Sequence, residues 1–154
     1  MSALTMSALF AFLHHIAAFT LIASLASEFV LLRETLTLSI ARKLRTADMV
    51  FGLSAAAVLA VGLLRVFYFE KGASYYFSSV PFMLKLTLFI LIGVLSIYPT
   101  VEFLSWKRSI QGGQAPVVAA GKLRRLRAAI HMELAAAAAL VLCAALMARG
   151  VGEL

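Results

Sequence analysis

Eight ionisable side chains interrupt the long apolar segments of this chain, and they are its residues best suited to chemistry. They are His14, His15, Glu28, Arg65, Lys85, Glu102, His131 and Glu133. A charge inside a bilayer is costly, so ionisable residues within apolar segments indicate functional sites. Imidazole ligates iron, and arginine or lysine neutralises the propionates of haem. These residue types therefore favour binding of a b-type haem or another porphyrin.

The elements that must position these residues are transmembrane helices. Of the 154 residues, 63% are hydrophobic and 14% are charged, whereas about a quarter of residues are charged in an ordinary soluble domain. Four apolar segments approach or meet the ~20 residues that a helix needs to cross a bilayer. We predict an all-α, integral membrane four-helix bundle that forms a single domain over residues 1–154, with helices near 6–32, 49–69, 81–104 and 128–148.

Several chemistries are excluded by the residues available. Cys143 is the only cysteine, so the chain alone builds no intramolecular disulfide, cysteine zinc site or iron–sulfur cluster. Soluble catalysis has no support either, because the sequence contains no phosphate loop and no HExxH motif.

Orientation follows from the basic residues near the helix ends, since basic loops stay on the cytoplasmic side. Ten of the 14 cations lie in the first and third connections: Arg33, Arg42, Lys43, Arg45, Lys107, Arg108, Lys122, Arg124, Arg125 and Arg127. We therefore expect a multi-pass protein of the bacterial inner membrane with both termini on the non-cytoplasmic side. Topology accounts for the net charge of +7, so we expect the lipid bilayer, and no nucleic acid, as a partner. The first connection, from Arg33 to Asp48, is expected to extend the first helix; the alternative is an interfacial amphipathic turn or two, since Leu36, Leu38, Ile40 and Leu44 alternate with polar residues.

The outer cluster consists of His14, His15, Arg65 and Lys85, which this topology places near one membrane face. His14 lies roughly 12 Å below the start of its helix at 1.5 Å rise per residue. We expect His14 or His15 to be an axial ligand of haem b, with Arg65 and Lys85 as propionate or substrate partners and Met83 as the second ligand. A metal ion such as copper would use His14, His15 and Met83, although the two cations oppose it. The alternative is that the cations reach the lipid headgroups, the histidines bond between helices and Met83 fills the core.

The segment from Arg65 to Phe77 is rich in aromatic residues at the same face. Tyr68, Tyr75 and Tyr76 are expected to form an aromatic belt at the membrane interface. A quinone or the edge of a porphyrin is the alternative partner for these rings.

The remaining intrusions form an inner set at the cytoplasmic ends of the helices. These are Glu28, Glu102, His131 and Glu133. Chains of glutamate and histidine carry protons in membrane proteins, so one interpretation of this set is a proton route. The other is interfacial ion pairing with Arg33, Lys107 and Arg127.

Four stretches of the sequence carry a resemblance to known proteins. They are the His14–His15 pair, GLLRVFYFEKGASYYF (Gly62 to Phe77), PFMLKL (Pro81 to Leu86) and ARG (Ala148 to Gly150). Together they resemble a bacterial family of short four-helix membrane proteins of unassigned function. This resemblance covers nearly the whole chain and implies a fold and a compartment, but no activity.

A more distant similarity links the chain to HemJ-type protoporphyrinogen oxidases and CopD-like membrane proteins. Those families have a lone histidine in the first helix and an aromatic-x-His-x-Lys-Leu pattern in the third, similar to His14 or His15 and to PFMLKL here. The similarity implies porphyrin or metal binding through His14 or His15 and Lys85. Met83 stands where the pattern has histidine, so bis-histidine ligation does not follow.

Two functions of different classes remain open. The first is a membrane-embedded haem- or porphyrin-binding protein with a redox or electron-transfer role, and an oxidoreductase is one form of it. The second is a non-enzymatic module, either an anion-binding subunit of a transporter or channel, or a structural partner of a membrane complex. In the second case the alanine-rich fourth helix is expected to form an interface with another membrane protein or with a second copy.

Overall fold

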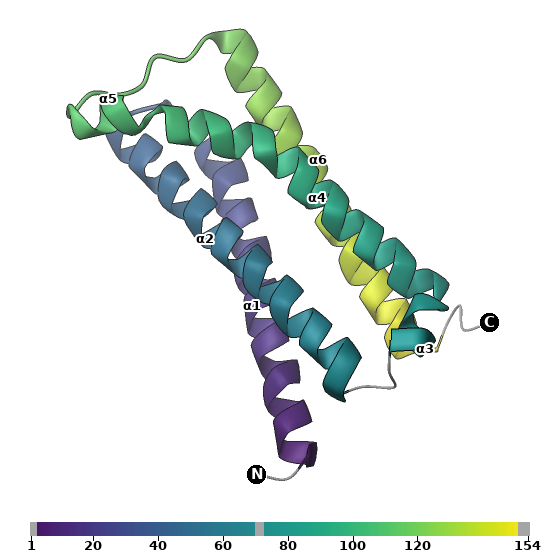
Figure 1. Cartoon of the computed structure of the whole chain (residues 1–154). Coiled ribbons are helices and arrows are strands. Elements are labelled where there is room, and N and C mark those ends of the chain that lie inside the picture. The colour runs from purple at the N-terminus through teal and green to yellow at the C-terminus, as the bar shows by residue number, and fades with distance from the viewer. Residues whose placement is uncertain (1–2, 70–72, 151–154) are drawn as a thin grey trace.

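The computed structural model describes residues 3–69 and 73–150, and within these ranges the chain is helical with no strand (Figure 1). Its long helices are α1 (Ala3–Leu31), α2 (Leu38–Leu64), α4 (Val80–Ser105) and α6 (Ala120–Ala148). A π-helical turn, η1 (Arg65–Phe69), continues α2, and two short helices are α3 (Ala73–Phe77) and α5 (Lys107–Gln111). All four long helices have the length and apolar composition needed to cross a membrane. The structure thus confirms the all-α class and the four apolar helices.

The second helix begins eleven residues before its predicted start at Met49. The prediction that the first connection extends the first helix is wrong. The first helix ends at Leu31 and α2 begins at Leu38. Thr37 is the N-cap, because its hydroxyl accepts a hydrogen bond of 3.2 Å from the backbone N–H of Ile40. Ala41 and Leu44 are fully buried in the bundle, so packing holds this basic segment in a helix.

The helices are arranged as two hairpins. The first pairs α1 with α2, and the second pairs α4 with α6, with sparser contacts between α1 and α6 and between α2 and α4. We call the end with the first and third connections the basic end, and the opposite end, toward which the N-terminus and C-terminus run, the terminal end. The hairpins diverge toward the terminal end (Figure 1).

The packed core lies mainly in the basic half of the bundle. Its most buried large side chains, each at most 3% exposed, are Leu25, Leu32, Leu44, Ile92, Phe103, Trp106, Leu126 and Ile130. The rings of Phe103 and Trp106 meet edge to face with centroids 5.0 Å apart. Arg127 donates a hydrogen bond of 2.7 Å from Nε to the carbonyl of Leu32, which ties the second hairpin to the first.

The terminal half has little packed core. On α1, no side chain from Leu4 to Thr20 is buried. The buried apolar side chains nearest this end among the described residues are Val66 in η1, Pro81 at the start of α4 and Cys143 in α6. The two hairpins are therefore held together at the basic end, while the terminal half leaves inward-facing side chains only partly covered.

Candidate functional site

His14 faces the second helix from within the terminal half. Its imidazole packs against Gly62, where a Cβ atom would lie 3.1 Å from Cε1 of His14. The Nδ1 atom is buried and has no hydrogen-bond partner among the described residues. The backbone at Gly62 approaches the ring closely and the backbone of Val58 also interacts with the imidazole, while Nδ1 itself makes no hydrogen bond within the described residues.

His15 lies on a different face of the same helix. One residue turns an α-helix by about 100°, and the His15 side chain is exposed. Its Nδ1 atom lies 2.6 Å from the carbonyl oxygen of Ala11, one turn earlier on its own helix. The structure thus separates the histidine pair into an inward-facing His14 and an outward-facing His15.

Two cations from other helices surround His14. Arg65 is the first residue of η1 and Lys85 lies on α4, and both side chains are half-buried. Their charges act on His14 and on each other. Cys143 of α6 is close enough to influence Lys85, so all four long helices contribute to this region. We call His14, Arg65 and Lys85 the cationic cluster.

The local backbone at Arg65 departs from the α-helix. From Arg65 to Phe69 the chain forms a π-helical turn, a feature that is rare and frequently found at functional sites. Such a turn changes the direction in which the following side chains point. Arg65 itself keeps α-helical backbone angles, and its N–H bonds to the carbonyls of Val61 and Gly62, so the turn redirects the residues that follow Arg65.

Met83 is not brought into the cationic cluster. It is 42% exposed, and it precedes Lys85 by two residues, or about 200° around an α-helix. Lys85 is half-buried and its charge acts on His14, whereas Met83 is exposed and lies on the opposite side of α4. The structure thus places His14, Met83 and the exposed His15 on separate faces, and no group of three or more His, Cys, Asp or Glu residues that could hold a metal ion occurs in the described part of the chain.

Two rings of the aromatic segment at the terminal end pack close to Phe82. The rings of Tyr76 and Phe77 have centroids 5.3 and 5.7 Å from that of Phe82. Tyr68 is 76% exposed, as an interfacial ring would be. The side chain of Tyr75 lies outside the described part of the structure.

The inner set divides into two pairs with different surroundings. Glu102 forms an ion pair with Lys122 at 3.1 Å and accepts a hydrogen bond of 3.2 Å from Nε1 of Trp106. His131 is exposed and its ring lies 5.9 Å from that of Phe29. Glu28 and Glu133, by contrast, are each only 1% exposed. The four residues therefore do not form one continuous chain of neighbouring side chains, because Glu28 and Glu133 are buried while Glu102 and His131 lie in other surroundings.

Asp48 is a buried carboxyl group that the sequence analysis missed. Its Oδ1 atom accepts a hydrogen bond of 2.6 Å from the hydroxyl of Thr100 on α4. It interacts electrostatically with both Glu28 and Glu133. A second helix that begins near Met49 leaves Asp48 in the first connection, where no buried position is predicted. The spacing of Ala41, Leu44 and Asp48 on one helical face was the available signal.

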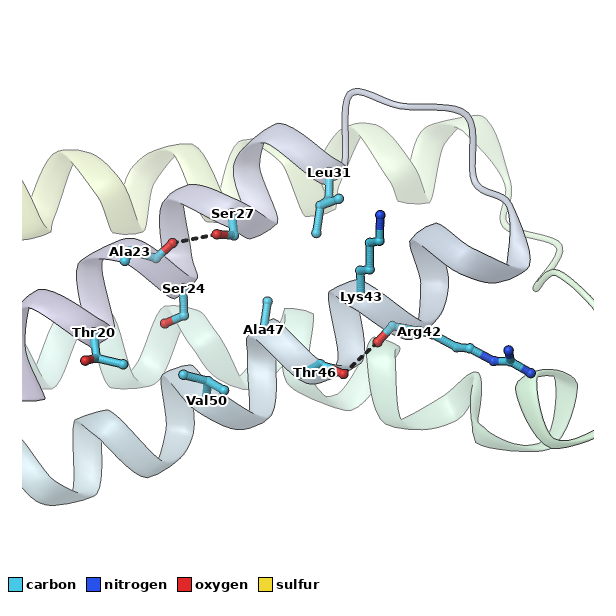
Figure 2. A pocket seen from close by; sticks show the side chains of 10 residues that line it. All are labelled: Thr20, Ala23, Ser24, Ser27, Leu31, Arg42, Lys43, Thr46, Ala47 and Val50. Atoms are coloured by element: carbon cyan, nitrogen blue, oxygen red, sulfur yellow. Dashed lines mark hydrogen bonds between the residues drawn. The ribbon is translucent and has the colours of Figure 1, made fainter.

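A groove of about 520 Å³ runs between α1 and α2 in the basic half (Figure 2). Small and hydroxyl-bearing side chains line most of it, and Arg42 and Lys43 lie toward its basic end. The hydroxyls of Ser27 and Thr46 donate to the carbonyls of Ala23 and Arg42 on their own helices. The groove is thus separate from the cationic cluster and offers few free polar groups.

Comparison with known proteins gives a family and no activity. A family model described as "Predicted membrane protein (DUF2214)" matches residues 6–152. No curated protein and no solved structure matches the chain. The similarity to HemJ-type and CopD-like proteins stays a prediction.

Proposed function

The chain belongs to the DUF2214 family of predicted membrane proteins, and from this premise we propose that it binds a b-type haem or a related porphyrin between its two hairpins and serves in electron transfer. The observation that carries the proposal is the buried, unpartnered Nδ1 of His14 beside Arg65 and Lys85 in the half of the bundle that lacks a packed core. His14 is the proposed axial ligand. Arg65 and Lys85 are the proposed partners of the propionates.

The chemistry of the cationic cluster fits such a ligand. A porphyrin is flat and apolar with two carboxylates at one edge, so it needs an apolar space between helices and cations at one side of that space. The terminal half supplies inward-facing cations and little packed core. When bound, haem iron supplies one-electron chemistry, and the protein tunes it through the ligand, the nearby charges and the burial of the site.

The surroundings of His14 favour a single protein ligand. Met83 points away, His15 is exposed, and His131 lies toward the basic end of α6. We therefore replace the His/Met arrangement expected from the sequence by a proposal with one imidazole. A five-coordinate haem spectrum is the corresponding expectation.

A second candidate function is favoured by one specific observation. Lys85 interacts with Arg65 and Cys143, and no carboxylate is among the described groups that act on it. Such a pair of cations also suits a small anion without a porphyrin, as in an anion-binding subunit of a transporter or channel. This alternative predicts that phosphate or chloride raises the melting temperature of the haem-free protein.

The membrane orientation supports a site near the outer surface. The basic end contains Arg42, Lys43, Arg124 and Arg125, all exposed, and positive residues stay on the cytoplasmic side. We propose that the basic end faces the cytoplasm of a bacterial inner membrane. The cationic cluster then lies in the outer half of the bilayer, with both termini on that side.

Replacement of Lys85 by glutamine tests the propionate partner. The change removes the charge and leaves a polar side chain that is one bond shorter. We expect affinity for haem to fall about tenfold, because an interaction with a charged group contributes about 1.5–3 kcal/mol and 1.4 kcal/mol is a factor of ten. Haem titration of the purified variant measures this. Lys107→Gln, an exposed change at the basic end, is the control, and equal affinity of both variants would contradict the assignment.

Replacement of Gly62 by valine tests the placement of His14. A Cβ atom at Gly62 would already lie 3.1 Å from the imidazole, and the added methyl groups must push the ring out of place. We expect loss of most haem binding in a titration, with the helical circular dichroism unchanged. Gly52→Val is the matched control on the same helix, because a Cβ atom at Gly52 meets nothing within 4 Å. Unchanged binding by Gly62→Val would contradict the role of His14.

A further inference from the structure

Three carboxyl groups lie inside the basic half of the bundle, each on the buried face of a different helix. Leu21, Leu25, Glu28 and Leu32 share one face of α1, and Ala41, Leu44, Asp48 and Phe51 share one face of α2. On α6 the corresponding residues are Leu126, Ile130, Glu133 and Ala137. The acids thus occupy positions that the helical repeat assigns to the core.

Apolar side chains enclose the acids on both sides along the bundle. Toward the basic end, the buried apolar side chains are Leu32, Leu44, Leu126 and Ile130, within two turns of the acids on the same helices, together with Phe103 on α4. Toward the terminal end it comprises Leu21, Leu25, Phe51, Ala136 and Ala137. Water has little access from either side, and Glu28 and Glu133 are accordingly each 1% exposed.

The charged groups around the acids leave Glu28 and Glu133 without a cation. Arg45 on α2 acts on Asp48, whereas Arg127 on α6 bonds to the carbonyl of Leu32. Lys122 on α6 pairs with Glu102 on α4, and Arg33 lies over the ring of Phe29. His131 is exposed. The described groups that act on Glu28 and Glu133 are other acids alone.

Independent evidence for a ligand comes from the hydrogen bonds. The Oε1 atoms of Glu28 and Glu133 are buried and have no hydrogen-bond partner in the described structure, whereas Oδ1 of Asp48 accepts a hydrogen bond of 2.6 Å from the hydroxyl of Thr100. Two ionised carboxylates in an apolar interior are very costly without a compensating cation. The described residues do not form a group that could hold a metal ion. A proton bound to a carboxyl oxygen removes the charge without any further ligand.

We infer that Glu28 and Glu133 form a buried proton-binding site, in which each holds a proton at neutral pH, and that Asp48 and Thr100 complete the polar interior of this site. The site is separate from the cationic cluster, because it lies in the basic half and uses different residues. Its ligand is the proton, with one proton bound to each of the two glutamates. Glu102 and His131 do not belong to it.

Infrared spectroscopy of the purified wild-type protein at neutral pH tests the inference. We expect C=O stretching bands of protonated carboxyl groups that shift in D₂O. Glu28→Gln and Glu133→Gln should each remove one protonated group, since glutamine keeps the shape of the side chain. Glu102→Gln is the matched control, because this carboxylate is paired with Lys122, and it should leave the bands unchanged. Absence of protonated carboxyl bands from the wild type would overturn the inference, and so would their loss on addition of Na⁺.

A second measurement on the wild-type protein keeps the test valid if a variant fails to fold. Dicyclohexylcarbodiimide reacts with protonated carboxyl groups in apolar surroundings, and mass spectrometry locates the adduct. We expect modification of Glu28 or Glu133, reduced at alkaline pH, and none at Glu102. Modification of Glu102 with neither buried glutamate labelled would count against the site.

Discussion

Replacement of His14 by alanine is expected to abolish haem uptake, whereas replacement of His15 by alanine is expected to leave it intact. His14 faces the bundle interior beside Arg65 and Lys85, with its Nδ1 buried and unpartnered. His15 is exposed and its Nδ1 lies 2.6 Å from the carbonyl of Ala11. Loss of the only inward-facing imidazole in this half removes the proposed iron ligand, so the effect should exceed that of any single cation.

The two variants form a matched pair because they remove the same ring from adjacent positions. Each is purified from haem-replete cells, and the ratio of the Soret absorbance to the protein absorbance is compared with that of the wild type. External imidazole should restore part of the Soret band in His14→Ala by occupying the vacated position. If the His15 variant loses the band and the His14 variant keeps it, the assignment of the ligand is wrong.

Replacement of Phe103 by alanine is expected to lower the free energy of unfolding by about 3 kcal/mol. The side chain is fully buried and packs against Trp106 where the two hairpins meet. Removing a buried phenylalanine costs ~3–5 kcal/mol in soluble proteins. We expect the lower end of this range, because lipid is as apolar as the core and mainly the packing contribution is lost.

Leu104 supplies the control for this second prediction. It follows Phe103 directly and is 55% exposed, so Leu104→Ala should change the free energy of unfolding by less than about 0.5 kcal/mol, as is usual for surface positions. Both values come from unfolding in mixed detergent micelles, followed by circular dichroism. Similar losses in the two variants would show that the hairpins are not held together mainly at the basic end.

The four helices could be predicted from the sequence because uninterrupted apolar length is a strong signal. The start of the second helix could not, because its first turns carry Arg42, Lys43 and Arg45, which resemble a cytoplasmic loop. Their helical structure depends on the Thr37 cap and on tertiary burial of Ala41 and Leu44. The same displaced boundary explains why Asp48 was missed.

The candidate site was predictable in composition but not in geometry. Topology brings His14, Arg65 and Lys85 to one end of the bundle, and the structure places them close enough to interact. Sequence spacing could not decide which histidine faces inward, since this depends on the rotation of α1 against Gly62 of α2. The two-residue spacing of Met83 and Lys85, in contrast, already placed them on opposite faces of a helix.

The acids of the inner set occupy two different environments that their positions in the sequence do not distinguish. The sequence predicts Glu102 and Glu133 near the same end of neighbouring helices. In the structure α6 begins at Ala120, earlier than the predicted 128, so Glu133 lies at mid-helix and is enclosed by the core, whereas Glu102 is paired with Lys122 near the end. Only the three-dimensional packing separates an interfacial ion pair from a buried carboxyl group. The distinction assigns different roles to residues that the sequence placed in one set.

The absorption spectrum of the wild-type protein, purified from haem-replete cells, tests the central claim most directly. We predict a Soret band whose position and shape indicate a five-coordinate, histidine-ligated haem, together with changes in the visible bands on reduction by dithionite. A colourless protein that also takes up no haem or porphyrin when these are added in detergent or nanodiscs would contradict the account.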